Sequence, residues 1–407
     1  MRELRLAGTF TLALIMLSIQ SSGVGHVRAQ AKQDSPLPTK EYFNFSPVDV
    51  EIPIAPTPVE SGGKAHLAYE LHITNFQSSD LGLVSVEVLN GTSPIASYND
   101  EELIGRLFHV GVSGDLPDKR IIGGGMRLVV YIWLTVEKVA VPSALRHRFT
   151  FKVPKLDGSG EESYVEGAQI EVRKESPVVI APPFRSGTWA AGNGPSNTNV
   201  HRRALNRVAG KARIPQRFAF DWLKLGDKAK GEDVGKLVHD DAKKNENWYD
   251  YGSEILAVAD AVVSAVKDGI PENVPLSVKR AVPITLETIA GNYVFLDLGQ
   301  NRFALYAHLQ PGIRVKVGDK VRRGQVLGLL GNSGNSDSPH LHFHIVDGNS
   351  PLGAEGLPFV FESYEVLGVP NDLGLLTRDN GWAPQPGAAI EKCKNEMPLE
   401  NMIIRVP

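Results

Sequence analysis

Runs in which apolar and polar residues alternate follow one another through the first half of the chain. Alternation with a period of two is typical of β-strands that bury one face. Gly, Pro, Asn and Asp residues separate the runs, which favours a β-rich protein with many turns. The runs that predict strands are 65–73, 81–89, 126–136 and 148–153. Short strands at this spacing predict an immunoglobulin-like β-sandwich over residues 45–176.

The rest of the chain divides by composition. Residues 177–195 are rich in Pro and Gly and are interpreted as a linker, or as the first loop of the next domain. A second, mainly antiparallel β domain is expected over residues 196–370, followed by a C-terminal extension over 371–407. The apolar run 402–404 in this extension is a candidate strand that returns to one of the two domains.

Two further segments of the second domain have a recognisable pattern. Glycines and valines over residues 315–328 predict two short strands joined by a Gly-Asp turn. The polar insert 223–250 is a candidate lid or wall of a groove, with Trp222 and Trp248 as candidate lining residues.

The N-terminus has the pattern of an export signal over residues 1–29. Arg2 and Arg5 precede an apolar stretch over 6–19, which is shorter than the roughly 20 residues of a membrane span. We expect a flexible segment over 30–44, no integral membrane span after signal cleavage, and a secreted or periplasmic location. An uncleaved membrane anchor is the alternative.

Composition and charge exclude some classes of function. The net charge of −3 does not indicate a nucleic-acid partner. Cys393 is the only cysteine, so the chain can form neither an intrachain disulfide nor a thiol-rich metal site. The oligomeric state cannot be predicted from these features.

Histidines gather in one part of the second domain. Alternate residues of a strand share a face and lie about 6–7 Å apart, so a strand over 340–345 has one apolar face and one face that carries imidazoles. Histidine is a common metal ligand, and hydrolytic zinc sites use three protein ligands and a water. The alternative is a strand with an incidental polar face. The alternating residues are His340, His342 and His344 against Leu341, Phe343 and Ile345.

Segment 339–343 resembles the His-x-His strand of the lysostaphin/LytM-type zinc metalloendopeptidases, whose fold is a duplicated hybrid motif. Segment 306–309 is similar to the second His motif of that family, and the glycine-rich residues lie between the two motifs. The resemblance covers roughly residues 200–350. It implies a mainly β protein in which an N-terminal immunoglobulin-like β-sandwich precedes a lysostaphin-type antiparallel β peptidase domain. The other matching segments are 218–222, 251–260 and 331–334.

The resemblance also implies roles for individual residues. Asp221 and His342 would bind one Zn²⁺ per chain, and His308 and His340 would flank the open coordination position as the catalytic histidines. His344 stands where the family commonly has an acidic residue. It either orients a ligand or points outward at the strand end.

One ligand of the family pattern is missing. The family has a histidine four residues before the metal-binding Asp, but this chain has Arg217 there, and a guanidinium has no lone pair for zinc. We favour His201 as the third metal ligand. The alternatives are His239, or a site that has no third protein ligand.

These features predict a zinc metalloendopeptidase. The expected substrate is a peptide of peptidoglycan, either a stem or a cross-bridge, or another extracellular peptide. The first alternative is a catalytically degenerate member of the same fold that binds the cell wall or a partner protein. The second is a biotinyl-like or phosphotransferase-like carrier, which the export signal disfavours.

Overall fold

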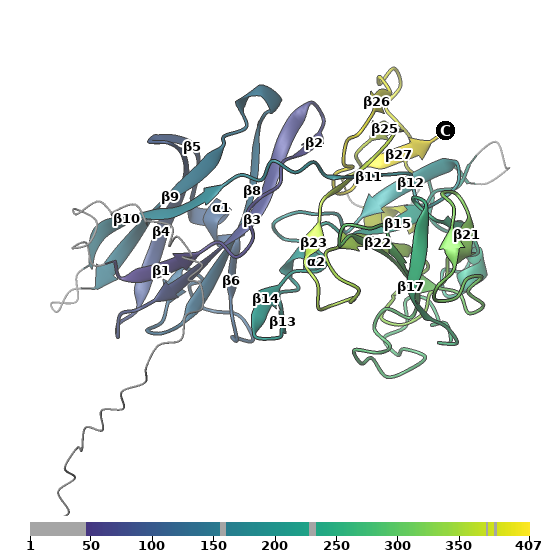
Figure 1. Cartoon of the computed structure of the whole chain (residues 1–407), viewed down its shortest axis with the longest axis horizontal. Helices are drawn as coiled ribbons and strands as arrows, with labels where there is room; N and C mark the ends of the chain where they lie inside the picture. Colours follow the sequence, from purple (N-terminus) through teal and green to yellow (C-terminus); the bar gives the residue numbers. More distant parts are fainter. Residues whose placement is uncertain (1–45, 155–159, 228–232, 372, 378–380) are drawn as a thin grey trace, which may run out of the picture. The chain divides into compact units, whose positions relative to one another are not determined.

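The computed structural model describes residues 46–407 except 155–159, 228–232, 372 and 378–380 (Figure 1). The expected signal peptide (1–29) and the expected flexible segment (30–44) lie outside the described residues. Among the described residues, no helix is both long and apolar enough to cross a bilayer. The structure is mainly β with mostly antiparallel pairing, which confirms the predicted fold class.

The first half of the chain forms two five-stranded sheets that enclose one apolar core. One sheet has the order β1-β3-β8-β6 with β2 beside β3, and the other has the order β10-β9-β4-β5 with β7 beside β4. The four predicted strands are confirmed as β3, β4, β8 and β9. The assignment of this β-sandwich as immunoglobulin-like stays a prediction. Its elements are β1 (Val48–Glu51), β2 (Val59–Ser61), β3 (Lys64–Asn75), β4 (Leu81–Asn90), β5 (Ser93–Asn99), α1 (Asp100–Ile104), β6 (Leu107–His109), β7 (Ile121–Ile122), β8 (Arg127–Glu137), η2 (Lys138–Ala140), β9 (Ala144–Pro154) and β10 (Gly160–Glu171).

Strand β3 is buried on both of its faces. Leu67 and Tyr69 point into the core of the β-sandwich, as the alternation predicts. Residues on the opposite face are also buried, including Ala68 and Glu70. Ala68 packs in the core of the second half of the chain. Because an isolated sandwich would expose this face to water, the burial shows that the second half covers it.

The second half is built around an eleven-stranded sheet with the order β20-β17-β18-β19-β22-β15-β12-β27-β25-β26, with β23 beside β22. Smaller pairs complete it. Its elements are β11 (Val178–Ile180), β12 (Gly187–Gly192), α2 (Val200–Arg203), β13 (Asn206–Val208), β14 (Lys211–Arg213), β15 (Phe220–Lys224), η4 (Asn245–Asn247), β16 (Glu254–Leu256), β17 (Ala261–Lys267), β18 (Asn292–Asp297), β19 (Phe303–Leu309), β20 (Lys320–Val321), β21 (Val326–Leu329), β22 (Leu341–Val346), β23 (Gly356–Leu357), β24 (Phe359–Phe361), β25 (Tyr364–Gly368), η5 (Leu373–Thr377), β26 (Glu391–Cys393) and β27 (Ile403–Val406).

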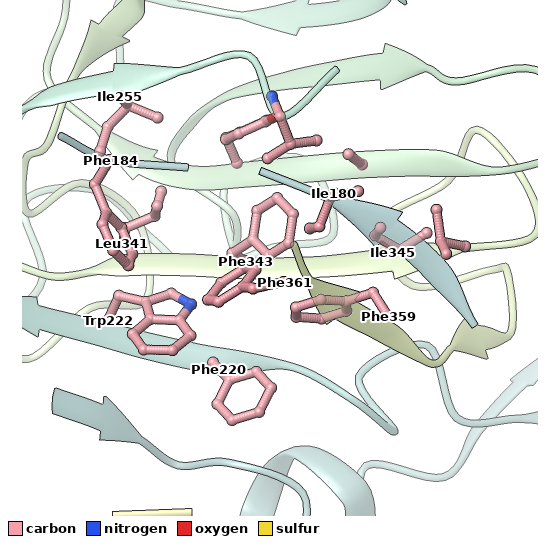
Figure 2. Packing of buried hydrophobic residues seen from close by; sticks show 14 of the residues in the cluster. Ile180, Phe184, Phe220, Trp222, Ile255, Leu341, Phe343, Ile345, Phe359 and Phe361 are labelled. Atoms are coloured by element: carbon pink, nitrogen blue, oxygen red, sulfur yellow. The ribbon is translucent and has the colours of Figure 1, made fainter. Parts of the chain in front are cut away.

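Aromatic side chains from β15, β22 and β24 fill the main core of this half (Figure 2). Phe220 stacks on Trp222 with ring centroids 5.2 Å apart. Trp222 is fully buried here, and Trp248 is buried in a neighbouring apolar cluster. The interpretation of both tryptophans as groove-lining residues was therefore wrong, because burying these large apolar rings in a core removes more surface from water than lining a groove would.

Residues 177–195 form two strands rather than a linker. They contain β11 and β12, and β12 pairs with β15 on one side and β27 on the other. Pro and Gly flank the strand, whereas its interior is the apolar run 189–191. A side chain at Gly192 would lie 2.9 Å from the Asp221 carbonyl oxygen, so glycine allows β15 to approach. The expected return of run 402–404 as a strand is confirmed by β27.

The predicted hairpin over residues 315–328 is also different in the structure. β20 pairs with β17, and β21 pairs with β16, so the two strands do not pair with each other. The predicted Gly-Asp turn, at Gly318 and Asp319, precedes β20 and does not join the two strands. The pattern of glycines and valines could not show that each strand finds its partner in the segment 254–267, because that choice depends on long-range packing.

Candidate metal centre

Asp221 and His342 face each other across two paired strands. They are direct partners in the register of β15 and β22. The Nδ1 atom of His342 lies 2.9 Å from Asp221 Oδ1. Their neighbours Phe220 and Phe343 pack into the apolar core, so the alternation along both strands places the polar pair on the opposite face. The strand register alone therefore brings a carboxylate and an imidazole together.

His201 reaches the same place from the one-turn helix α2. The side chain of Asn199 caps this helix by accepting a hydrogen bond from the His201 backbone N–H at 2.8 Å. The ring Nδ1 of His201 lies 3.0 Å from the carbonyl oxygen of Asn193. A carbonyl only accepts, so Nδ1 is the nitrogen that carries the proton. This leaves the lone pair on Nε2, which lies 3.5 Å from Asp221 Oδ2.

The three residues together form a group that can hold a metal ion. One ligand atom from each of His201, Asp221 and His342 lies within 4.8 Å of the others. Two imidazole nitrogens and a carboxylate oxygen are a donor set that suits zinc with one open position. Asn193 also donates from its side-chain amide to Asp221 Oδ2 at 2.7 Å, which orients the carboxylate. The residues present therefore fit a zinc ion.

The structure separates the two candidates for the third ligand. His239 is exposed and packs beside Tyr249, with ring centroids 5.4 Å apart. It belongs neither to the metal-ligand group nor to the cleft described below. His201 belongs to both. Arg217, at the position of the absent histidine, is buried and donates to the carboxylates of Glu355 and Glu70. Its side chain is therefore directed to an ionic contact and not to the metal-ligand group.

His308 and His340 form a second pair beside this group. Their ring centroids are 4.9 Å apart. Each Nδ1 lies 2.8 Å from a backbone carbonyl oxygen, that of Ser333 for His308 and that of Ser338 for His340. Each Nδ1 therefore donates, and each Nε2 is left to act on a substrate or a proton. The Nε2 of His340 lies 3.4 Å from Asp221 Oδ1.

The backbone at His308 is strained. Its φ of +62° lies in the left-handed region, which costs a residue other than glycine about 1–3 kcal/mol and is often found at functional sites. The backbone N–H of His308 donates to the Ala290 carbonyl at 3.0 Å instead of continuing the strand ladder. This irregularity within β19, where its register with β18 shifts, thus places the imidazole over the site.

The pKa values of the two imidazoles shift in opposite directions. Burial opposes the charge of His340, but the neighbouring Asp221 carboxylate outweighs it and raises the pKa of His340 to about 9. Burial, followed by repulsion from His340, lowers the pKa of His308 well below its ordinary value. A cation on Asp221 would oppose the rise at His340. A pair of titratable groups with separated pKa values is typical of acid–base sites.

The electrostatics of His201 and Asp221 suit metal binding. Burial lowers the pKa of His201 to about 4, which keeps its ring neutral, as ligation requires. Burial would raise the pKa of Asp221, but His201 and His340 outweigh that effect and hold it well below its ordinary value. The carboxylate is therefore ionised at neutral pH.

A cleft of about 600 Å³ opens over these side chains. That volume is within the range of sites that bind small ligands or peptide segments. Apolar residues form part of its wall, including Leu286 and Leu352. All five predicted site residues line the cleft: His201, Asp221, His308, His340 and His342.

Three further residues contact the candidate ligands: His344, for which the sequence left two alternatives open, and Gln216 and Asn193, which sequence reasoning missed. His344 is fully buried, and its Nδ1 lies 2.9 Å from His342 Nε2. The Gln216 amide nitrogen lies 3.4 Å from the same atom. Asn193 was assigned to the presumed linker, and a lone Asn there carries no sequence signal apart from its position beside glycines, where it adopts a positive φ of 48°.

Comparisons with known proteins agree with this geometry. Residues 248–353 match the model of peptidase family M23. Over 65 residues the chain is 45% identical to the peptidoglycan DD-endopeptidase ShyA of Vibrio cholerae, and this alignment covers 16% of this chain and 15% of that protein. Over 95 residues it is 30% identical to ShyC of the same organism, with coverage of 23% and 19%. Over 38 residues it is 53% identical to the glycyl-glycine endopeptidase ALE-1 of Staphylococcus capitis, with coverage of 9% and 10%.

The chain therefore contains a lysostaphin/LytM-type domain of peptidase family M23. The aligned regions span less than a fifth of the length of these three relatives. The family match includes His308, His340 and His342 but begins after His201 and Asp221. Only the tertiary structure brings the last two residues to the matched region.

Proposed function

We propose that this protein is a secreted or periplasmic zinc metalloendopeptidase that hydrolyses peptide bonds in the stem or cross-bridge peptides of peptidoglycan. The observation that carries the proposal is the convergence of His201, Asp221 and His342 beside the pair His308 and His340 in one cleft. The substrate class is supported by the relatives, among which are peptidoglycan DD-endopeptidases and a glycyl-glycine endopeptidase.

In this proposal, zinc would be held by His201 Nε2, the Asp221 carboxylate and His342 Nδ1. When bound, zinc supplies Lewis-acid chemistry, which polarises a carbonyl group and lowers the pKa of water toward 7. Binding through Nδ1 requires the proton of His342 to be on Nε2, which then donates to His344 Nδ1. This hydrogen bond fixes the tautomer and the ring orientation of His342.

The two remaining histidines move protons. Their Nδ1 atoms are committed to backbone carbonyls, so each ring has one nitrogen, Nε2, with which to act. One of His308 and His340 accepts a proton from the attacking water as general base. The other donates a hydrogen bond to the oxyanion and a proton to the leaving amine. Their opposite pKa shifts suit such a division of roles.

Metal analysis and hydrolysis together test the proposal. The purified protein, dialysed against metal-free buffer, should retain close to one zinc per chain. It should also release soluble peptides from purified peptidoglycan, and a chelator should stop that release. A protein without retained zinc that still binds peptidoglycan would instead support the catalytically degenerate alternative. Arg217 favours the degenerate alternative, because it stands where the family pattern has a histidine ligand. His201 lies within the candidate ligand group and can take the place of that histidine.

A further inference from the structure

Glu70 lies at the centre of a buried cluster of charges outside the metal centre. Its Oε1 accepts hydrogen bonds from Arg202 Nε and Nη2 at 3.1 and 3.0 Å. Its Oε2 accepts from Arg217 Nη1. Arg217 also donates to Glu355 Oε1 at 3.0 and 2.7 Å. We call Glu70, Arg202, Arg217 and Glu355 the ionic cluster. All four are at most 3% exposed, and two positive charges balance two negative ones.

The ionic cluster joins the β-sandwich to the helix that carries His201. Glu70 belongs to β3, and Arg202 directly follows His201 in α2. Arg202 Nη2 also donates to two carbonyl oxygens of the sandwich, that of Tyr69 at 3.0 Å and that of Ile132 at 2.7 Å. The guanidinium is thus fastened to β3 and β8 by four hydrogen bonds, two of which end on Glu70.

Helix α2 depends on such external contacts for its position. It has only four residues, and a single helical turn is not stable by itself in water. The Arg203 side chain provides a second attachment, because its Nη1 donates to the Leu107 carbonyl of β6 at 2.8 Å. The location of the His201 ring is therefore determined by the sandwich as much as by the peptidase half.

We propose that Glu70 is a positioning residue for the metal centre, so that the N-terminal β-sandwich completes the zinc site through Arg202 and His201. This inference rests on the proposed function, since it takes His201 as a zinc ligand. Without the Glu70 carboxylate, two buried guanidiniums share one counter-ion, and Arg202 loses two of the four hydrogen bonds that fasten it to β3 and β8. His201 then loses its place beside Asp221.

The test compares Glu70→Gln with Glu355→Gln in the full-length protein. Both variants remove one negative charge from the ionic cluster, but only the first removes a partner of Arg202. Zinc affinity is measured by competition with a chelator, well below the unfolding temperature of each variant. We expect about 10–100-fold weaker zinc binding in Glu70→Gln, the range found for residues that orient metal ligands, and wild-type affinity in Glu355→Gln. The visible spectrum of bound Co²⁺ should change in the first variant alone.

Equal zinc affinity in Glu70→Gln and the wild type, or equal losses in both variants, would overturn the positioning role. If Glu70→Gln does not fold, Arg202→Met provides the test, because it leaves Glu70 paired with Arg217. The same loss of zinc affinity is then expected, and wild-type affinity would overturn the inference. A wild-type protein that binds zinc but does not cleave peptidoglycan would contradict the proposed function and leave this inference standing. A wild-type protein without zinc would contradict both.

Discussion

The metal centre and the ionic cluster both bury charged groups, but they differ in what is left unpaired. In the ionic cluster, each guanidinium is bound by carboxylates, and the Glu70 carboxylate accepts bonds at both oxygens. In the metal centre, the Nδ1 atoms of His201, His308 and His340 each donate to a backbone carbonyl oxygen, and all three side chains line the cleft. A cluster whose partners are all internal holds structure together, whereas polar side chains that line an open cleft can bind and react.

The largest expected effect comes from removing His201. His201→Ala should lose the retained zinc and all peptidoglycan hydrolysis, because only Asp221 and His342 would then remain as protein ligands. Zinc per chain and peptide release measure the two effects. His239→Ala is the matched control, since this exposed histidine lies outside the cleft, and it should behave as the wild type. Loss of zinc in the control with retention in His201→Ala would assign the third ligand to His239 instead.

The next largest effect separates proton transfer from metal binding within the centre. His340→Ala should lower kcat about 10²–10⁴-fold, the contribution typical of a general acid or base, while one zinc per chain is retained. The His340 side chain lies 3.4 Å from Asp221 but is not a member of the proposed ligand group. If zinc disappeared along with activity, His340 would have to be counted among the ligands.

The ionic cluster should respond in stability. Arg217→His restores the histidine of the family pattern, yet we expect no gain in zinc affinity, because Arg217 is directed to Glu70 and Glu355. The variant leaves Glu70 paired with Arg202 alone and removes the guanidinium that binds the buried Glu355 carboxylate. Breaking a buried ion pair costs about 3–5 kcal/mol. Urea unfolding measures this loss. An unchanged free energy of unfolding with tighter zinc binding would contradict this prediction, because it would show that a histidine at position 217 reaches the metal.

Strand patterns could be predicted because they depend on neighbours along the chain. Alternation placed β3, β4, β8 and β9, and the period of two across 340–344 placed His342 on the polar face of β22. The resemblance to the family added Asp221, which the structure puts opposite His342 in the strand register. These features need only local geometry and a known motif, so the sequence contained them.

Tertiary structure decided which distant groups meet. His201 lies 20 residues before Asp221 in the chain, and nothing local distinguishes it from His239. It reaches the site because Asn199 caps its helix and Arg202 binds Glu70 from the other half of the chain. Distant pairing also explains β12, which lies in the Pro- and Gly-rich segment 177–195. It forms a strand because it pairs with β15 on one side and β27 on the other. Sequence by itself determined the faces of the strands and the types of chemical group they carry. The sequence favoured His201 as the third ligand, but only folding brings it beside Asp221, because that contact depends on packing between segments more than a hundred residues apart.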